Sequence, residues 1–259
     1  MTTVVESLTE WRNLRNGQAF EKKRIGFVPT MGNLHAGHLS LLERSRQQDD
    51  ISVLSIFVNA PQFNDENDLE GYPRTLGADL QAARDKKIDY VLCPTHAALY
   101  PDDFTYKVTE SRLSNTLCGQ RRAGHFDGVL TVVLKLLLLV RPDRCYFGEK
   151  DYQQLQLIKG MVAAFFMDTE VVPCPTVRDH DGLAFSSRNL RLSDSERELA
   201  AQFPSILRQR LPLTEVTDSL NRAGFVVEYV EEALGRRFGA VYIGNKRLID
   251  NIPLSELGV

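Results

Sequence analysis

Apolar runs alternate with segments of helical periodicity through the first two thirds of the chain. The runs have few polar interruptions, which is typical of parallel strands buried on both faces. Strands are expected at 25–28, 51–58, 88–93, 144–147 and 170–173, and helices at 39–48, 76–87, 126–140 and 152–165. This alternation predicts an α/β fold with a doubly wound parallel sheet, whose ligands bind beyond the carboxyl ends of the strands.

Two Ser-x-x-Glu capping boxes and a pair of prolines predict helix ends and a domain boundary. Ser7 begins a helix that should run to about Asn16, and Ser193 begins one that should run to about Phe203. The alternation stops after Pro173 and Pro175. We therefore expect a larger domain over 1–176 and a smaller C-terminal α+β domain over 177–259, with a helix at 214–223 and strands at 225–230 and 240–243.

Composition narrows the class of protein. Hydrophobic residues make up 43% of the 259 residues and the net charge is −3, so no basic excess is present to bind nucleic acid. The four cysteines show no Cys-x-x-Cys spacing and predict reduced thiols in a cytoplasmic protein. The segment 1–16 lacks the apolar core of a signal peptide. The longest apolar run, 129–140, is shorter than the ~20 residues of a membrane span, so no membrane partner is expected.

A glycine turn at 28–42 joins the first strand to the next helix. Gly32 and Gly37 have the spacing of a phosphate-binding Walker loop, but His38-Leu39 replaces the Lys-Ser/Thr that should follow. Backbone N–H groups and the helix dipole of such a junction suit a phosphate, although many glycine turns only reverse the chain. His35 and His38 share one face of a helical turn. Core histidines are the alternative, yet two adjacent imidazoles are hard to satisfy in an apolar core.

The run Pro-Thr-Met-Gly-Asn-Leu-His-Ala-Gly-His at 29–38 resembles the signature of the pantoate–β-alanine ligase (pantothenate synthetase) family. That family belongs to the nucleotidylyltransferase superfamily, which has a Rossmann-like sheet and is related to class I aminoacyl-tRNA synthetases. Further blocks resemble the family in its order, at 55–63, 72–76, 124–128, 147–154, 181–189 and 247–251. The resemblance implies a Rossmann-like ATP- and pantoate-binding domain followed by a C-terminal lid domain.

The resemblance also implies roles for particular residues. His38, His35, Lys150 and Arg188 are expected to be catalytic, and Gln62 and Gln154 to bind pantoate, with Gln62 also near β-alanine. The ATP site is expected to comprise Met31, Gly32, Asn33, Leu34, His35, Ala36, Gly37, His38, Gly148, Glu149, Lys150, Asp151, Val177, Phe185, Ser186, Ser187 and Arg188. The chain departs from the family pattern at Ala60-Pro61, at Ala123 and at Phe185.

The implied reaction has two steps. Pantoate attacks the α-phosphorus of ATP to give pantoyl adenylate and pyrophosphate, and the amine of β-alanine then displaces AMP to give pantothenate. The acidic segment 64–72 is expected to be a solvated loop or a flexible wall over the site. Mg²⁺ and a homodimer are expected, while the ligands of the metal stay open. The alternatives are a nucleotidylyltransferase with a CDP or dinucleotide product, and a nucleotide-binding sensor without chemistry.

Overall fold

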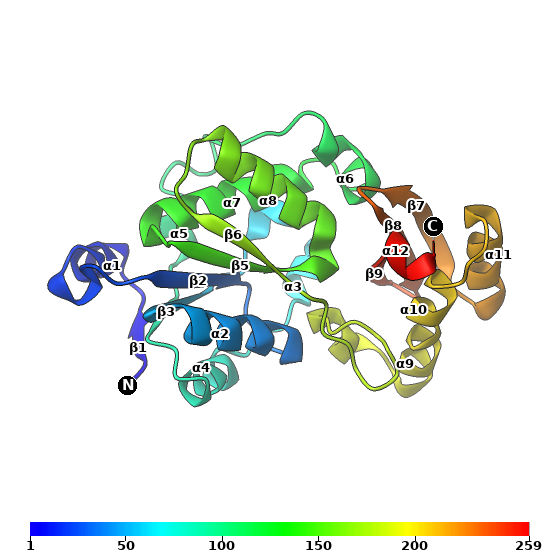
Figure 1. Ribbon diagram of the computed structural model, residues 1–259, viewed down its shortest axis with the longest axis horizontal. Helices are drawn as coiled ribbons and strands as arrows, with labels where there is room; N and C mark the ends of the chain where they lie inside the picture. The colour runs from blue at the N-terminus through cyan, green and yellow to red at the C-terminus, as the bar shows by residue number, and fades with distance from the viewer. Residues whose placement is uncertain (259) are drawn as a thin grey trace. The chain divides into compact units, whose positions relative to one another are not determined.

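The computed structural model describes residues 1–258, which form two compact units (Figure 1). The first unit comprises 1–149 and 153–174. The second comprises 150–152 and the chain from Pro175 onward. Within the described residues, no helix combines the length and the apolar character needed to cross a membrane.

A six-stranded parallel sheet forms the centre of the first unit. Its strands are β1 (Thr3–Val5), β2 (Ile25–Thr30), β3 (Ile51–Ile56), β4 (Tyr90–Leu92), β5 (Arg144–Gly148) and β6 (Glu170–Cys174), in the order β1-β4-β3-β2-β5-β6. The prediction of a doubly wound parallel sheet is confirmed. β1 was not predicted, because three residues are too few to show a pattern.

Helices cover both faces of this sheet. The helices between β1 and β6 are α1 (Leu8–Arg15), α2 (Ala36–Gln48), α3 (Glu66–Glu70), α4 (Leu76–Asp85), α5 (His96–Leu99), α6 (Leu117–Arg121), α7 (His125–Val140) and α8 (Tyr152–Ala164). In Figure 1, α2 and α4 lie on one side of the sheet and α7 and α8 on the other. The strand order reverses direction between β2 and β5. In doubly wound sheets, ligands bind at the carboxyl ends of the strands at such a switch point.

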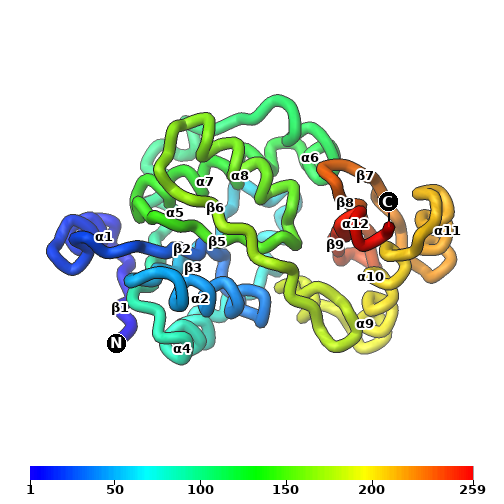
Figure 2. The backbone as a smooth tube through the Cα atoms, in the orientation of Figure 1, coloured from blue at the N-terminus to red at the C-terminus, as the bar shows by residue number. Residues whose placement is uncertain are grey.

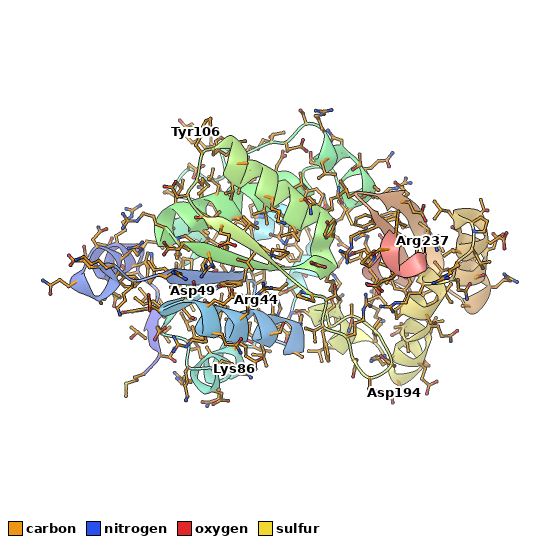
Figure 3. All side chains as sticks on the ribbon, in the orientation of Figure 1. Arg44, Asp49, Lys86, Tyr106, Asp194 and Arg237 are labelled. Carbon is orange, nitrogen blue, oxygen red and sulfur yellow. The ribbon has the colours of Figure 1, made fainter. Side chains whose placement is uncertain are left out.

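The position of α2 is fixed by contacts at its C-terminal end. Asp49 follows this helix, and its Oδ2 accepts a hydrogen bond of 2.5 Å from the hydroxyl of Tyr146 in β5 (Figure 3). Arg144 donates to the other carboxylate oxygen over 3.2 Å. A Cβ on Gly26 of β2 would lie 2.1 Å from Asp49 Oδ2 and 2.2 Å from Ser45 Oγ. Glycine at 26 therefore lets α2 pack directly on the sheet, which sets where its N-terminal end lies.

The second unit contains a three-stranded antiparallel sheet, ordered β7-β8-β9 (Figure 2). Its elements are the 3₁₀ turn η5 (Ser187–Arg191), α9 (Asp194–Ala200), α10 (Gln202–Leu207), α11 (Leu213–Ala223), β7 (Val226–Ala233), β8 (Arg236–Ile243), β9 (Lys246–Pro253) and α12 (Leu254–Leu257). Apolar side chains of α10 and α11 pack on the sheet, among them Phe203, Leu207 and Leu220. The α+β character predicted for this region is confirmed.

One prediction in this unit needs correction, and one strand was missed. The helix expected from Ser193 to about Phe203 is two helices, since α9 ends at Ala200 and α10 begins at Gln202. Pro204 explains the break, because its ring clashes with the carbonyl four residues earlier, at Ala200. β9 was not predicted at all, since its run Lys246–Pro253 mixes charged and apolar residues.

Buried Arg237 of β8 connects that strand to the loop after α10 (Figure 3). Its guanidinium donates to the carbonyls of Gln209 over 2.6 Å and Leu211 over 3.1 Å, and it pairs with Glu232. A longer bond of 3.4 Å reaches the Leu207 carbonyl at the end of α10. Together these bonds satisfy the buried charge and a helix-end carbonyl that has no intrahelical partner.

Candidate nucleotide and substrate site

The glycine turn follows β2 directly and has left-handed backbone at two positions. Gly32 has φ +82° and Asn33 has φ +52°. A Cβ on Gly32 would lie 2.9 Å from Asp79 Oδ2 and 3.1 Å from Ile56, so both its conformation and its surroundings favour glycine. The hydroxyl of Thr30 donates to the Ser55 carbonyl over 2.8 Å and accepts from the Gly32 N–H over 3.2 Å.

Asp79 of α4, which the sequence analysis did not single out, holds this turn in place. Its Oδ2 accepts from the Asn33 N–H over 2.9 Å, and its Oδ1 from the Leu34 N–H over 2.7 Å. These two N–H groups are therefore bonded to Asp79 rather than open to a phosphate, while the predicted contacts of residues 33 and 34 with ATP stay predictions. The side-chain amide nitrogen of Asn33 is buried and has no hydrogen-bond partner, which suits a group kept for a ligand.

His35 and His38 lie at the N-terminal end of α2, which begins at Ala36 rather than at the predicted Leu39. His35 is the N-cap residue, and its ring stacks on that of His38 with centroids 4.0 Å apart. His38 Nδ1 accepts a long hydrogen bond of 3.4 Å from the His35 backbone N–H. An accepting Nδ1 places the proton of the neutral ring on Nε2. His38 is therefore set up as an Nε2–H donor at a helix N-terminus, where anions are stabilised.

Gln62 lies beyond the carboxyl end of β3, the neighbour of β2 in the sheet. The register pairs Thr30 with Ile56, so the turn after β2 and the loop after β3 leave the same edge. Residues Ala60–Gln62 form one 3₁₀ turn in which Pro61 lies near the N-terminal end. Proline is tolerated there because the first N–H groups of a helical turn have no intrahelical partner. The Ala60-Pro61 departure is thus accommodated without removing Gln62.

The remaining predicted residues of the first unit follow β5, on the other side of β2. Gly148 ends β5, Glu149 begins a 3₁₀ turn, and Gln154 is half-buried on α8. Its neighbour Gln153 is buried and bonds to the carbonyls of Leu113 and Thr116 over 2.8 Å each. Gln153 therefore has a structural role, whereas Gln154 has the accessibility that a ligand contact needs.

Lys150 and Asp151 belong to the second unit. Lys150 Nζ lies 3.8 Å from Asp151 Oδ1, and the Lys150 carbonyl accepts from Asn251 Nδ2 over 2.9 Å. Asn251 is buried on β9, so the small sheet holds the backbone of Lys150. Asn251 lies in the block 247–251 that resembles the family, but no role was predicted for it.

The segment 177–188 forms a braced loop in the same unit. The Phe185 N–H donates to the Val177 carbonyl over 3.1 Å, and Arg178 bridges to Ala184. Arg178 also makes a two-bond salt bridge to buried Asp250, over 2.7 and 2.8 Å. Ser186 caps the following 3₁₀ turn by accepting from the Arg188 N–H over 3.3 Å. Predicted residues of this segment are therefore presented by a fixed backbone.

The acidic segment 64–72, expected to be a solvated loop or a flexible wall over the site, includes regular structure. It contains the short helix α3, capped by Asp65, whose Oδ1 accepts from the Asn67 N–H over 2.9 Å. Tyr72 is buried and packs edge-to-face on Phe63, with ring centroids 5.6 Å apart. Sequence periodicity could not reveal a helix of only five residues.

Between Met1 and Gly258, no three His, Cys, Asp or Glu side chains gather in a way that could hold a metal ion. Mg²⁺ commonly keeps several waters and binds through substrate phosphates with one or two carboxylates, so this arrangement is compatible with a nucleotide-borne ion.

The doubly wound sheet, the switch point and the histidine-bearing turn define the class of protein as a nucleotide-binding α/β protein. Comparison with known proteins then gives the family. The family model for pantoate-beta-alanine ligase matches residues 3–253. The pantothenate synthetase of Coxiella burnetii is 53% identical over 256 residues, covering 99% of this chain and 98% of that protein.

Solved structures agree with the family model. The pantoate-beta-alanine ligase of Francisella tularensis, complexed with beta-gamma ATP and beta-alanine, has a TM-score of 0.94 at 40% identity and covers 98% of each chain. The pantothenate synthetase of Thermus thermophilus has a TM-score of 0.88 at 36% identity, covering 97% of this chain and 99% of that one. This chain belongs to the pantoate–β-alanine ligase family, and the prediction of a ligase of this family is confirmed.

Proposed function

We propose that this protein catalyses the ATP-dependent condensation of pantoate with β-alanine, giving pantothenate, AMP and pyrophosphate. The observation that carries the proposal is the placement of His35 and His38 at the switch-point edge of the sheet, one strand away from Gln62. A nucleotide site beside a neutral amide suits a reaction between a triphosphate and a small polar acid.

In the first step, the pantoate carboxylate attacks the α-phosphorus and expels pyrophosphate. This nucleophile is already an anion, so it needs neutralisation of charge rather than a general base. His38 Nε2–H and the N-terminal end of α2 supply donors to the phosphates. Lys150 and Arg188 add positive charge on the triphosphate. Mg²⁺, carried by the nucleotide, neutralises phosphate charge when it is bound.

In the second step, the amine of β-alanine attacks the acyl carbon of pantoyl adenylate and AMP leaves. The amine must be neutral to react, although its pKa in water is ~10. We assign no residue as its base, and the proton leaves to water or phosphate. Gln62 and Gln154 hold pantoate in both steps, with Gln62 also near β-alanine.

Two alternatives predict other behaviour. A nucleotidylyltransferase would retain the nucleotide in its product, and it would prefer the nucleoside triphosphate that carries the base found in that product. A sensor would bind nucleotide without turnover. The two half-buried glutamines, Gln62 in the turn after β3 and Gln154 on α8, favour a second small polar substrate over either alternative.

Pyrophosphate exchange tests the proposal. With ATP, Mg²⁺ and pantoate, the protein should exchange labelled pyrophosphate into ATP without β-alanine, and omission of pantoate should abolish exchange. Gln154→Ala should weaken exchange through pantoate, whereas Lys150→Ala should suppress it even at saturating pantoate. Exchange that strictly required β-alanine would contradict the adenylate route, and nucleotide binding without any exchange would favour a sensor.

We also propose a homodimer formed through the first unit. Exposed apolar side chains support it: Leu138 near the end of α7, and Phe165 and Phe166 just after α8. Both helices run antiparallel to the strands, so their C-terminal ends lie near the amino ends of the strands. These side chains therefore lie at the edge of the sheet opposite the carboxyl ends, where the site is proposed. A monomer in light scattering at micromolar concentration would contradict this proposal.

The four free cysteines support a cytoplasmic location, which fractionation of cells would test.

A further inference from the structure

Side chains from three elements surround Gln62 and contact both its side chain and its backbone. Asn59 Nδ2 donates to Gln62 Oε1 over 3.0 Å. His125 Nδ1, on the first turn of α7, lies 2.7 Å from the Gln62 carbonyl oxygen. Arg122 Nη1 lies 2.9 Å from His125 Nε2. Asn59 and His125 are buried, so each of these bonds has one partner removed from water.

The orientation of the Gln62 amide follows from donors and acceptors whose identity is fixed. The Gly128 carbonyl can only accept, and it lies 3.1 Å from one end of the Asn59 amide, so that end is the NH₂ group. The other end accepts from the Tyr100 hydroxyl over 2.7 Å. The Asn59 NH₂ group therefore faces Gln62 and requires an oxygen there. Gln62 consequently turns its own NH₂ group, with two donors, away from Asn59.

The tautomer of His125 follows by the same reasoning. The Gln62 carbonyl accepts only, so His125 Nδ1 must carry a proton. The Arg122 guanidinium donates only, so His125 Nε2 must accept. His125 is therefore the neutral Nδ1–H tautomer, and Arg122 holds it in that state.

The close approach of α7 to this loop depends on Gly128. A Cβ at that position would lie 2.7 Å from the Gln62 backbone nitrogen and 2.7 Å from the Pro61 carbonyl oxygen. Backbone atoms on both sides cannot yield as a flexible side chain would. Any larger residue would push Gln62 away from His125 and from Asn59 together.

We propose that His125, oriented by Arg122, is a positioning residue that fixes the Gln62 backbone, and that Asn59 presents the Gln62 NH₂ group as a donor pair to the oxygens of the acid substrate. The inference rests on the proposed function, because it gives Gln62 its substrate. It assigns Gln62 the role of donor rather than acceptor toward carboxylate or hydroxyl oxygens. His125 itself contacts no substrate in this scheme.

Paired substitutions separate positioning from general stability. In His125→Asn the amide can donate from the Nδ1 position, whereas in His125→Gln it reaches only the Nε2 position. His125→Gln should raise the KM for pantoate roughly 10- to 100-fold, as expected for loss of a buried positioned bond, with the KM for ATP unchanged. His125→Asn should restore the pantoate KM to within a few-fold of wild type. His180→Gln, on the exposed loop of the second unit, is the matched control.

The donor assignment has its own variant. Gln62→Glu keeps the shape and still offers an oxygen to Asn59, but it removes both donors, so the pantoate KM should rise at least as far as in Gln62→Ala. An unchanged pantoate KM in Gln62→Glu would overturn the donor assignment.

The outcomes also separate this inference from the function it rests on. If Gln62→Ala raises the pantoate KM while His125→Gln does not, the positioning role is wrong and the Gln62 role survives. If Gln62→Ala changes neither the KM for pantoate nor the KM for β-alanine, then the positioning role of His125 and the substrate-binding role of Gln62 are both wrong. Pyrophosphate exchange would still report whether the protein has the proposed overall activity. An equal loss in both His125 variants, accompanied by a lowered Tm, would show a structural role only.

Discussion

The Asp79 carboxylate lies 2.9 Å from the backbone nitrogen of Asn33, 46 positions away in the chain, and holds the turn that carries the two histidines. Each bond from a backbone N–H to a charged, buried carboxylate contributes about 1.5–3 kcal/mol. Asp79 accepts two such bonds, from Asn33 and Leu34, so Asp79→Ala should lower the free energy of unfolding by ~3–6 kcal/mol in urea melts and weaken ATP binding. Asp85→Ala, on the exposed face of the same helix, should change neither. Equal stability of the two variants would contradict the role of Asp79.

Two glycines near this turn should respond oppositely to alanine. Gly32 has φ +82° and lies against Asp79, so Gly32→Ala should cost at least the ~1–2 kcal/mol of a left-handed alanine and displace the turn. Gly77 is in the first turn of α4 with no atom within 4 Å of an added Cβ, so Gly77→Ala should stabilise by up to about 0.5 kcal/mol. Thermal melts and ATP titrations of both variants check this, and a neutral Gly32→Ala would show that the turn tolerates a side chain.

Burial raises the pKa of the Cys93 thiol to about 11, with Glu6 and Asp79 adding smaller effects. The thiolate is the reactive form, and an unperturbed thiol has a pKa of ~8.5. At pH 8 the folded protein should therefore react with Ellman's reagent about a hundredfold more slowly at Cys93 than the unfolded chain. Cys93→Ala identifies its share of the signal. Rapid release of one equivalent at pH 8, absent in Cys93→Ala, would contradict the raised pKa.

The Lys135 ammonium donates to Asp102 over 2.6 Å and holds the pKa of that carboxyl at about 2, with help from the Tyr106 N–H. A depressed folded-state pKa stabilises the fold above the unfolded pKa of ~3.9, and this contribution is lost as the pH falls from about 4 through 2. Asp102→Asn should therefore have a lower urea midpoint than wild type at pH 6, and the difference should shrink toward pH 2. Asp103→Asn, on an exposed neighbour, is the matched control.

The sequence predicted those parts of the fold in which local pattern and tertiary role agree. The long buried run that forms α7 and the buried strands β2, β3 and β5 were identified because their apolar character is continuous. The Ser7 and Ser193 capping boxes marked helix starts that the structure confirms. β1 and β9 were missed because one is short and the other carries charged residues on an antiparallel sheet.

The site was only partly predictable for a different reason. His35, His38 and Gln62 stand in recognisable motifs, so the sequence could indicate them. Asp79 and Asn251 act through hydrogen bonds to backbone atoms 46 and 101 positions away, and no local pattern signals such a contact. Both are buried polar residues, which is the signal that a structure supplies and a sequence does not.

His38 provides the most direct test of the chemistry. Its Nδ1 accepts from the His35 N–H, which places the proton of the neutral ring on Nε2, and we expect this Nε2–H to donate to the developing phosphate charge. Removal of such a positioned donor lowers turnover by ~10²–10⁴. His38→Ala should show this loss in pyrophosphate exchange at saturating ATP and pantoate, because the donor acts on the transition state and not only on binding. Its Tm should stay close to that of wild type, since the ring is only half-buried.

The conservative variant completes the test. His38→Gln places an amide NH₂ close to the position of Nε2 and should recover part of the lost exchange, because a neutral donor suffices in this scheme. His96→Ala, at the exposed start of α5, controls for removal of an imidazole from the same unit. If His38 instead had to transfer its proton as an acid, His38→Gln would recover none of the lost exchange. The exchange rate would then fall at high pH in the wild-type protein but not in the variants. Turnover near that of wild type in His38→Ala would remove this residue from the mechanism altogether.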